Sequence, residues 1–276
     1  SAFAAKQLVF AHAALTDLQG RRLLHDQRIA RAGMGVASTA ENDTDIRLRD
    51  WSLKRQADGR YAARVPASGF SLELDFMPSQ PLLLQGDEGL SRKGAGIDET
   101  SYYYSEPQLK VAGRIGLEDR HFVPSEGRAW LDHEWSETIM SPQAVGWDWI
   151  GMNLHDGGAL TAFRLRDGAD NPLWAGGSWR DRNGKLRVFT EREVHFEPQR
   201  RWTSPGSRAS YPVEWRLGTP AGRFRIKALL DNQELDSRGS TGTIYWEGLS
   251  ELQDERGQAV GRGYLEMTGY AGKLRL

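Results

Sequence analysis

Short stretches in which apolar and polar residues alternate recur along most of the chain. Residues 70–76 show the clearest case, because apolar side chains stand at every second position over the whole stretch. This spacing places the apolar set on one face of a β-strand. Dipeptides typical of tight hairpin turns, such as Asp58-Gly59, separate neighbouring stretches. The pattern therefore predicts an all-β fold built from many short antiparallel strands, as in a sandwich or a barrel.

Three segments interrupt this pattern. Residues 16–32 are the only stretch with a helical tendency, and their polar content favours a short helix or an extended crossing. Residues 86–96 form a long, charged, glycine-rich loop, and loops of that length in compact domains are often functional. The alternation pauses again at Met140-Ser141-Pro142, near the middle of the chain. We therefore expect two domains, residues 1–140 and residues 141–276.

Composition excludes several classes of protein. The 36 basic and 37 acidic residues give a net charge of −1 without any charged run, so a nucleic-acid-binding surface is not expected. Apolar runs are far shorter than the ~20 residues that a transmembrane helix needs. The absence of cysteine excludes disulfides and cysteine-based zinc sites, and the six histidines lack metal-ligand spacing. We therefore expect no metal and no cofactor. The sequence also lacks the Gly-x-Ser-x-Gly motif that would indicate the nucleophile of a hydrolase.

The most informative stretch runs from Trp130 to Trp135 and reads Trp-Leu-Asp-His-Glu-Trp. On a strand, Asp132 and Glu134 share the face of Trp130, whereas His133 shares the face of Trp135. Each face combines an aromatic wall with a group that can exchange a proton, as acid–base chemistry on an apolar molecule requires. The alternative is structural, with tryptophans in the core and carboxylates paired with arginine.

A second candidate acid stands in the stretch Trp147-Asp148-Trp149. On a strand, Asp148 shares a face with Ile150 and Met152, while the two tryptophans occupy the opposite face. A carboxylate on an apolar face is desolvated, and its pKa rises unless a cation pairs with it. The alternative is a salt bridge to an arginine that lines the barrel. Because Pro142 can turn the chain, we expect His133 and Asp148 to border one cavity at the domain junction with Trp135 or Trp149. The alternative is that the tryptophans only pack the two barrels against each other.

Two tyrosine positions are candidates for binding a ligand. Tyr103 faces away from its two tyrosine neighbours and can line a pocket, although such runs more often pack both sides of a sheet. Tyr264 shares a strand face with Glu266, while Leu265 and Met267 occupy the other face. The face of Tyr264 is ligand-lining if the barrel interior is polar and aromatic, and it is solvent surface otherwise.

A set of motifs distributed over essentially the whole chain resembles the carotenoid 1,2-hydratase-like, or AttH, family of lipocalin-like proteins. The bacterial branch of that family is called "predicted secreted hydrolase". The motifs, in chain order, are Phe-Ala-His-Ala-Ala (10–14), Leu-Gln-Gly-Asp (84–87), Ser-Arg-Lys-Gly (91–94), Ser-Tyr-Tyr-Tyr-Ser (101–105), Ala-Trp-Leu-Asp-His-Glu-Trp (129–135), Gly-Trp-Asp-Trp (146–149), Asp-Asn-Gln-Glu-Leu-Asp-Ser (231–237) and Gly-Tyr-Leu-Glu-Met-Thr-Gly-Tyr (263–270).

The resemblance implies two tandem lipocalin-like β-barrels. The hydratases add water across an isolated carbon–carbon double bond, which requires an acid kept protonated in a dry pocket. Their Asp-His-x-Trp motif falls on Asp132, His133 and Trp135. Their second acid has no match near Arg164, so Asp148 is the replacement that we consider.

The beginning of the chain departs from the family. Relatives carry an amino-terminal segment with a Glu-Trp-Trp-Tyr motif, whereas this chain opens at Ser1-Ala2-Phe3 without a signal peptide and resembles the middle of a longer protein. We therefore expect the first barrel to be incomplete and to be completed by that segment or by a second chain.

Together these features predict a bacterial protein exported to the periplasm or cell envelope, the location being implied by the resemblance. It would act on a lipophilic, isoprenoid or lipid-like small molecule by acid-catalysed hydration, isomerisation or cyclisation. The alternative is a non-catalytic carrier or chaperone of such a ligand. The candidate catalytic residues are Asp132, His133 and Asp148, and the candidate binding residues are Trp130, Trp135, Trp147, Trp149, Tyr103 and Tyr264.

Overall fold

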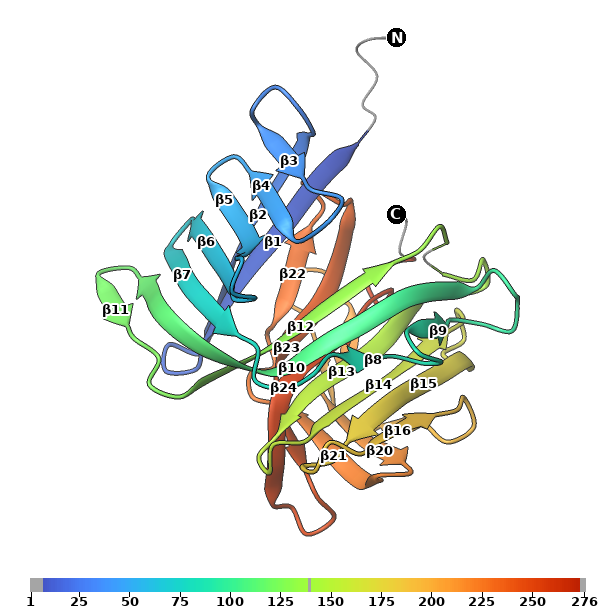
Figure 1. The fold of residues 1–276 in the computed structure, drawn as a ribbon. Coiled ribbons are helices and arrows are strands. Elements are labelled where there is room, and N and C mark those ends of the chain that lie inside the picture. The colour runs from blue at the N-terminus through green and yellow to red at the C-terminus, as the bar shows by residue number, and fades with distance from the viewer. Residues whose placement is uncertain (1–6, 139, 274–276) are drawn as a thin grey trace.

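The computed structural model describes residues 7–138 and 140–273, which form twenty-four β-strands and no helix (Figure 1). This confirms the all-β prediction. None of the described segments is a helix long and apolar enough to cross a membrane. Residues 1–6, on which the expectation of a longer protein rested, lie outside the described residues, as does Ile139 beside the expected domain boundary.

The first half of the chain forms an open, curled antiparallel sheet of ten strands. Its order is β11-β10-β7-β6-β5-β4-β3, with β8, β9 and β12 also paired to β10. Strands β3 and β11 stand at the two ends of the sheet and do not pair with each other. The sheet therefore curls without closing and forms a half-barrel (Figure 1). Its strands are β3 (Ala37–Thr39), β4 (Asp45–Leu48), β5 (Trp51–Arg55), β6 (Tyr61–Ala67), β7 (Phe70–Met77), β8 (Leu83–Leu84), β9 (Leu90–Arg92), β10 (Thr100–Leu117), β11 (Arg120–Phe122) and β12 (Gly127–Trp135).

A separate two-stranded hairpin comes before this sheet. β1 (Leu8–Asp17) pairs along its whole length with β2 (Arg22–Arg31), so of the two alternatives expected for residues 16–32 the extended one applies and the short helix does not form. The polar residues there serve contacts with the second half of the chain instead of a helix surface. Gln27, for example, donates a hydrogen bond from Nε2 to the carbonyl oxygen of Asp236 at 3.0 Å.

The second half forms a ten-stranded curled sheet around the main hydrophobic core. Its order is β16-β15-β14-β13-β24-β23-β21-β20-β17, with β22 paired to β23. Fully buried side chains such as Trp215, Trp246 and Leu265 fill its interior. Its strands are β13 (Gly146–Leu154), β14 (Ala159–Arg166), β15 (Pro172–Arg180), β16 (Leu186–Phe189), β17 (His195–Pro198), β20 (Glu214–Thr219), β21 (Gly222–Ala228), β22 (Glu234–Ser237), β23 (Thr243–Gln253) and β24 (Ala259–Met267), and β18 (Arg201–Thr203) and β19 (Ser210–Pro212) form a small hairpin beside it.

Strand β10 connects the two halves. Its pairing with β12 shifts register between Glu106 and Leu109, where Gln108 adopts a positive φ of 60°. This bulge bends the strand. The backbone N–H of Gln108 donates to Oδ1 of Asn153 in β13 at 2.7 Å, which fixes the bend against the second half. Residues 110–117 consequently belong to the half-barrel, whereas residues 100–105 lie over the carboxy-terminal sheet (Figure 1).

Candidate functional site

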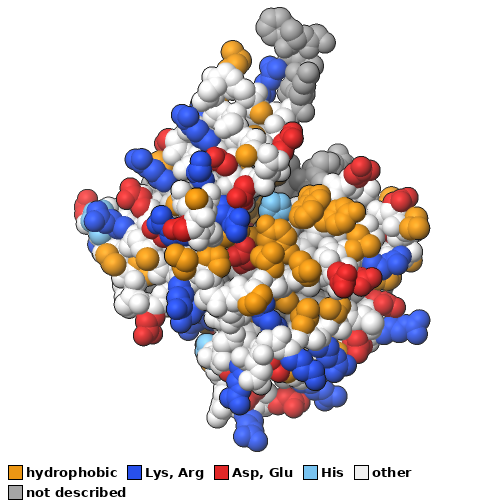
Figure 2. Space-filling view, in the orientation of Figure 1, with side chains coloured by type: hydrophobic (Ala, Val, Ile, Leu, Met, Phe, Trp, Pro, Cys, Tyr) orange, Lys and Arg blue, Asp and Glu red, His pale blue; other side chains and the backbone are white. Residues whose placement is uncertain are grey.

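A cavity of about 450 Å³ lies between the two halves of the chain. Hydrophobic side chains also gather on the surface over β10 and β12 (Figure 2), where Tyr102 and Trp135 are about half exposed. The cavity combines aromatic walls with acidic groups, and one cation enters from the glycine-rich loop. Its lining residues are Lys93, Tyr103, Asp132, Glu134, Trp135, Ser136, Met140, Trp147, Trp149, Phe163, Leu165 and Glu266.

Asp132 borders this cavity from strand β12. Its Oδ1 accepts two hydrogen bonds, from Oγ of Ser105 at 2.5 Å and from the indole Nε1 of Trp130 at 2.7 Å. Desolvation raises the pKa of Asp132 to about 6, although hydrogen bonds from Ser105, Trp130 and Tyr103 lower it. The negative charge of Glu134 adds to the rise. Asp132 can therefore exchange a proton close to neutral pH.

Lys93 brings a positive charge from the glycine-rich loop into the cavity. Its Nζ lies 2.7 Å from Oε1 of Glu134, and only 12% of its side chain is exposed. The same ammonium lies 4.9 Å from the ring centre of Tyr103 and 4.5 Å from that of Phe163. Cation–π attraction therefore supports the ion pair. Oγ of Ser101 donates a further hydrogen bond to Glu134 at 2.5 Å, so this carboxylate is fixed on both sides.

Two glutamates stand side by side on the face of the second sheet that is turned toward the half-barrel. Glu247 on β23 lies directly opposite Glu266 on β24, and Trp149 on β13 follows Glu266 in the same row. Burial is the main cause that raises their pKa values, to about 7 for Glu247 and about 8 for Glu266. The charge of each neighbouring carboxylate adds to the effect on Glu266, whereas a hydrogen bond from Trp147 opposes it. Glu266 is therefore mostly protonated at pH 7.

Aromatic side chains from both halves meet at the cavity. Nε1 of Trp149 donates to the hydroxyl of Tyr103 at 3.1 Å, and the rings of Trp130 and Trp149 lie edge to face with centres 6.4 Å apart. Gly151 permits this approach, because a Cβ atom there would overlap the ring of Trp149 and lie 3.0 Å from Trp130. Burial raises the pKa of Tyr103 well above its ordinary value, so its hydroxyl stays neutral.

The structure places Asp132 and His133 on opposite faces of β12, as the strand pattern predicts. His133 stacks on Tyr104 with ring centres 5.2 Å apart, and it does not line the cavity among the residues described. Trp135 stacks on Tyr102 at 5.4 Å but reaches the cavity from the end of the strand.

Tyr264 stands on the outer face of the second sheet, beside the row of Glu266. It lies opposite Gly151 on β13 and is 41% exposed, whereas Leu265 points into the core. Desolvation and then the charge of Glu247 raise the pKa of Tyr264 to about 12. The face that carries Tyr264 and Glu266 is therefore neither barrel interior nor free solvent surface, because it is turned toward the other half of the chain.

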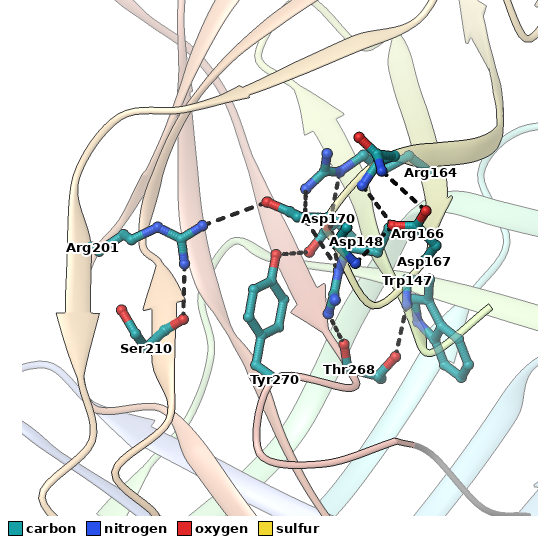
Figure 3. Close-up of polar contacts among 12 residues, drawn as sticks. Trp147, Asp148, Arg164, Arg166, Asp167, Asp170, Arg201, Ser210, Thr268 and Tyr270 are labelled. Carbon is teal, nitrogen blue, oxygen red and sulfur yellow. Dashed lines mark hydrogen bonds and ion pairs between the residues drawn. The ribbon is translucent and has the colours of Figure 1, made fainter. Parts of the chain in front are cut away.

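Asp148 does not reach the cavity, so the expected junction with His133 is not found. Figure 3 shows Asp148 together with Arg164, Arg166 and Tyr270 instead. Its side chain is fully buried on the core side of β13, in the face shared with Ile150 as predicted. Oδ2 lies 2.7 Å from Nε of Arg164 and 3.5 Å from Nε of Arg166, and Oδ1 accepts a hydrogen bond from the Tyr270 hydroxyl at 2.9 Å. Arginine stays protonated, so the structural alternative applies and Asp148 is an ion-paired carboxylate.

Lys93 and Glu266 are among the site residues that sequence reasoning did not select, as are Glu134 and Glu247. Lys93 comes from a loop whose sequence gives no indication of where its side chains point. Glu266 was placed on the correct face, but the pattern could not tell which face of β24 is buried against the other half. No group of His, Asp or Glu in the described part of the chain has the arrangement of a metal site.

A second cavity, of about 460 Å³, occupies the concave side of the half-barrel. Its lining is mostly apolar, and Asp132 borders both this cavity and the one between the halves. The two spaces therefore meet at the same carboxylic acid. The lining residues are Phe10, Ala11, His12, Ile46, Leu48, Trp51, Ser52, Leu53, Ala63, Val65, Phe76, Leu109, Ala129, Trp130, Leu131 and Asp132.

The family model and a solved structure of high sequence identity indicate the same family. The AttH-like family model matches residues 1–270. A crystal structure of an AttH candidate from Nitrosomonas europaea has a TM-score of 0.92 at 48% sequence identity, over 98% of this chain and 84% of that chain. Kievitone hydratase from Nectria haematococca has a TM-score of 0.76 at 17% identity, over 95% of this chain and 80% of that chain, which shows a common fold. No curated protein matches the sequence significantly.

Proposed function

Since the chain belongs to the AttH-like family, we propose that it is a lipocalin-like enzyme of the hydratase, isomerase or cyclase type. Its substrate would be a lipophilic small molecule with an isolated carbon–carbon double bond. The observation that carries this proposal is the meeting of Asp132 and Glu266, one from each half of the chain, in an aromatic cavity. The common fold with a hydratase supports the same type of chemistry.

The two acids would have different roles at neutral pH. Glu266, with a pKa of about 8, is the proton donor, and Asp132, with a pKa of about 6, is the base. Glu266 gives its proton to one carbon of the double bond and leaves a positive charge on the other carbon. The faces of Trp147 and Trp149 stabilise this charge through their quadrupoles.

Three outcomes follow from the same carbocation. A water molecule can add to it and lose a proton to Asp132, which gives an alcohol. The neighbouring carbon can lose a proton to Asp132 instead, which gives an isomer with a shifted double bond. A second double bond of the substrate can attack the cation and close a ring, and the new cation then loses a proton to Asp132, which gives a cyclic alkene. The apolar cavity of the half-barrel would hold the part of the substrate that does not react.

Deuterium transfer tests the proposal. An acyclic isoprenoid alcohol incubated with the protein in D2O should acquire deuterium on carbon, detected by mass spectrometry. Glu266→Gln and Asp132→Asn should each slow this incorporation ~10²–10⁴-fold, the usual effect of losing an acid or base. Glu251→Gln is the matched control, because Glu251 is on β23 and faces Arg262 at 3.9 Å, outside the cavity. Equal incorporation in all three variants would overturn the assigned roles.

A non-catalytic carrier is the second candidate function, and the apolar cavity of the half-barrel favours it. Closed eight-stranded barrels of the lipocalin type commonly hold one small apolar ligand without changing it, and the concave side of the half-barrel offers a similar apolar surface. Native mass spectrometry of protein purified from its own host separates the two functions. A copurified lipid that is released unchanged after long incubation, without deuterium on carbon in D2O, supports the carrier and contradicts the enzyme.

A further inference from the structure

A chain of hydrogen bonds between buried side chains leads to Asp132 from the other half of the protein. Oγ of Ser178 on β15 donates to Oε1 of Gln85 at 2.8 Å, and Nε2 of Gln85 donates to Oγ of Ser105 at 2.9 Å. Ser105 then donates to Oδ1 of Asp132 at 2.5 Å. Ser178 and Ser105 have no exposed surface, and Gln85 is 3% exposed. Water therefore does not compete for these groups.

The direction of the chain follows from the groups at its ends. An ionised carboxylate only accepts hydrogen bonds, so Ser105 must direct its single hydroxyl hydrogen at Asp132. The oxygen of Ser105 is then free to accept, and it takes an amide hydrogen of Gln85. This orientation leaves the carbonyl oxygen of Gln85 facing Ser178, which donates to it. All three side chains are thus oriented in one direction only.

We propose that Gln85 and Ser178 are positioning residues that direct the Ser105 hydroxyl at Oδ1 of Asp132 and so confine the proton of the neutral acid to Oδ2. Oδ1 already accepts from Ser105 and from Trp130, which occupies both of its lone pairs. Proton exchange at Asp132 therefore occurs through a single oxygen atom. The inference rests on the proposed role of Asp132 in proton transfer.

Ser178 carries a distinct and testable role in this arrangement. Without its hydroxyl, the amide of Gln85 can turn over and offer its carbonyl oxygen to Ser105. Ser105 then has two competing acceptors, and Oδ1 of Asp132 loses one donor. Because a hydrogen bond to a carboxylate stabilises its ionised form, Asp132 should become a weaker acid.

The experiment is a carboxyl ¹³C NMR titration of aspartate-labelled protein without any substrate, with Asp132→Asn identifying the signal. Ser178→Ala should raise the pKa of Asp132 by about one unit above its value in the unsubstituted protein. The matched control is Ser250→Ala, because Ser250 is also fully buried in the same sheet but donates only to the carbonyl of Gly248. An unchanged pKa in Ser178→Ala would overturn the proposal.

The double variant separates positioning from packing. Gln85→Met removes the competing carbonyl oxygen, so in Ser178→Ala/Gln85→Met the pKa of Asp132 should return to nearly its original value. If Ser178 acted only through packing, the second substitution would add to the first, and that result would also overturn the proposal. Should Ser178→Ala fail to fold, Ser178→Cys tests the same point without adding a charge. Its thiol is only a weak hydrogen-bond donor, so the pKa of Asp132 should rise here too, and an unchanged pKa would overturn the proposal.

Other charged groups around Asp132 stay the same in these variants. Those that act on it or respond to its charge are Tyr103 from β10, Glu134 from its own strand, Glu247 from β23 and Glu266 from β24. None of them is substituted. The titration needs no substrate, so its outcome is independent of whether the protein catalyses a reaction, which the deuterium experiment decides separately.

Discussion

Replacing Asp148 by asparagine should destabilise the carboxy-terminal half strongly, because it removes a fully buried acidic charge that is paired with two buried arginines. Asp148 has no exposed surface, and Arg164 and Arg166 are 7% and 5% exposed in their side chains. Asparagine keeps the size of the side chain but leaves the guanidinium groups without their buried counter-charge. Removing one partner of a buried ion pair costs about 3–5 kcal/mol of unfolding free energy. For a unit of this size the corresponding fall in Tm is roughly 10 °C.

Thermal unfolding followed by circular dichroism measures this loss. Asp170→Asn is the matched control, since Asp170 contacts the same Arg164 at 2.8 Å but is 37% exposed. An exposed pair of this kind contributes about 1 kcal/mol or less, so the control should unfold near the original temperature. The reasoning fails if the two variants lose the same stability, or if Asp148→Asn loses less than about 1 kcal/mol, within the range of an exposed pair.

The two glutamates on β23 and β24 predict a pH dependence of stability. In the folded protein Glu247 and Glu266 keep protons up to pH values of about 7 and 8, whereas the unfolded chain releases them near the ordinary value of 4.5. Between these pH values the folded state binds more protons than the unfolded state, so the unfolding free energy should fall as pH rises from 4.5 to 8. Urea titrations at several pH values measure this dependence, and Glu247→Gln should make it weaker. Gly151→Val should lower the unfolding free energy by about 1–3 kcal/mol, because the new side chain overlaps Trp149. Gly168→Ala is the control and should leave the unfolding free energy nearly unchanged in the same assay, because the nearest atom to its new Cβ lies at 3.9 Å.

Local patterns in the sequence predict the strands and the face on which a particular residue lies. Which side chains meet across neighbouring strands and loops depends on strand pairing, which these patterns do not predict. Alternation alone places Asp132 and Glu134 on one face of a strand, and the structure agrees. It also places Asp148 on an apolar face, but its partner Arg164 stands directly opposite on the next strand. That register depends on contacts distant in sequence, which local patterns do not encode. The entry of Lys93 into the cavity depends in the same way on where the glycine-rich loop crosses the other half of the chain.

The bent strand β10 takes part in the structure of both halves of this protein. One continuous backbone of eighteen residues supplies a strand of the half-barrel and, on the other side of the bulge, the layer that covers the second sheet. A cut at the middle of the sequence would therefore leave a carboxy-terminal fragment with an uncovered aromatic face, although all of its own strands remain. We therefore expect that neither half can be exchanged alone during evolution, because a strand encoded in the first half covers the aromatic face of the second.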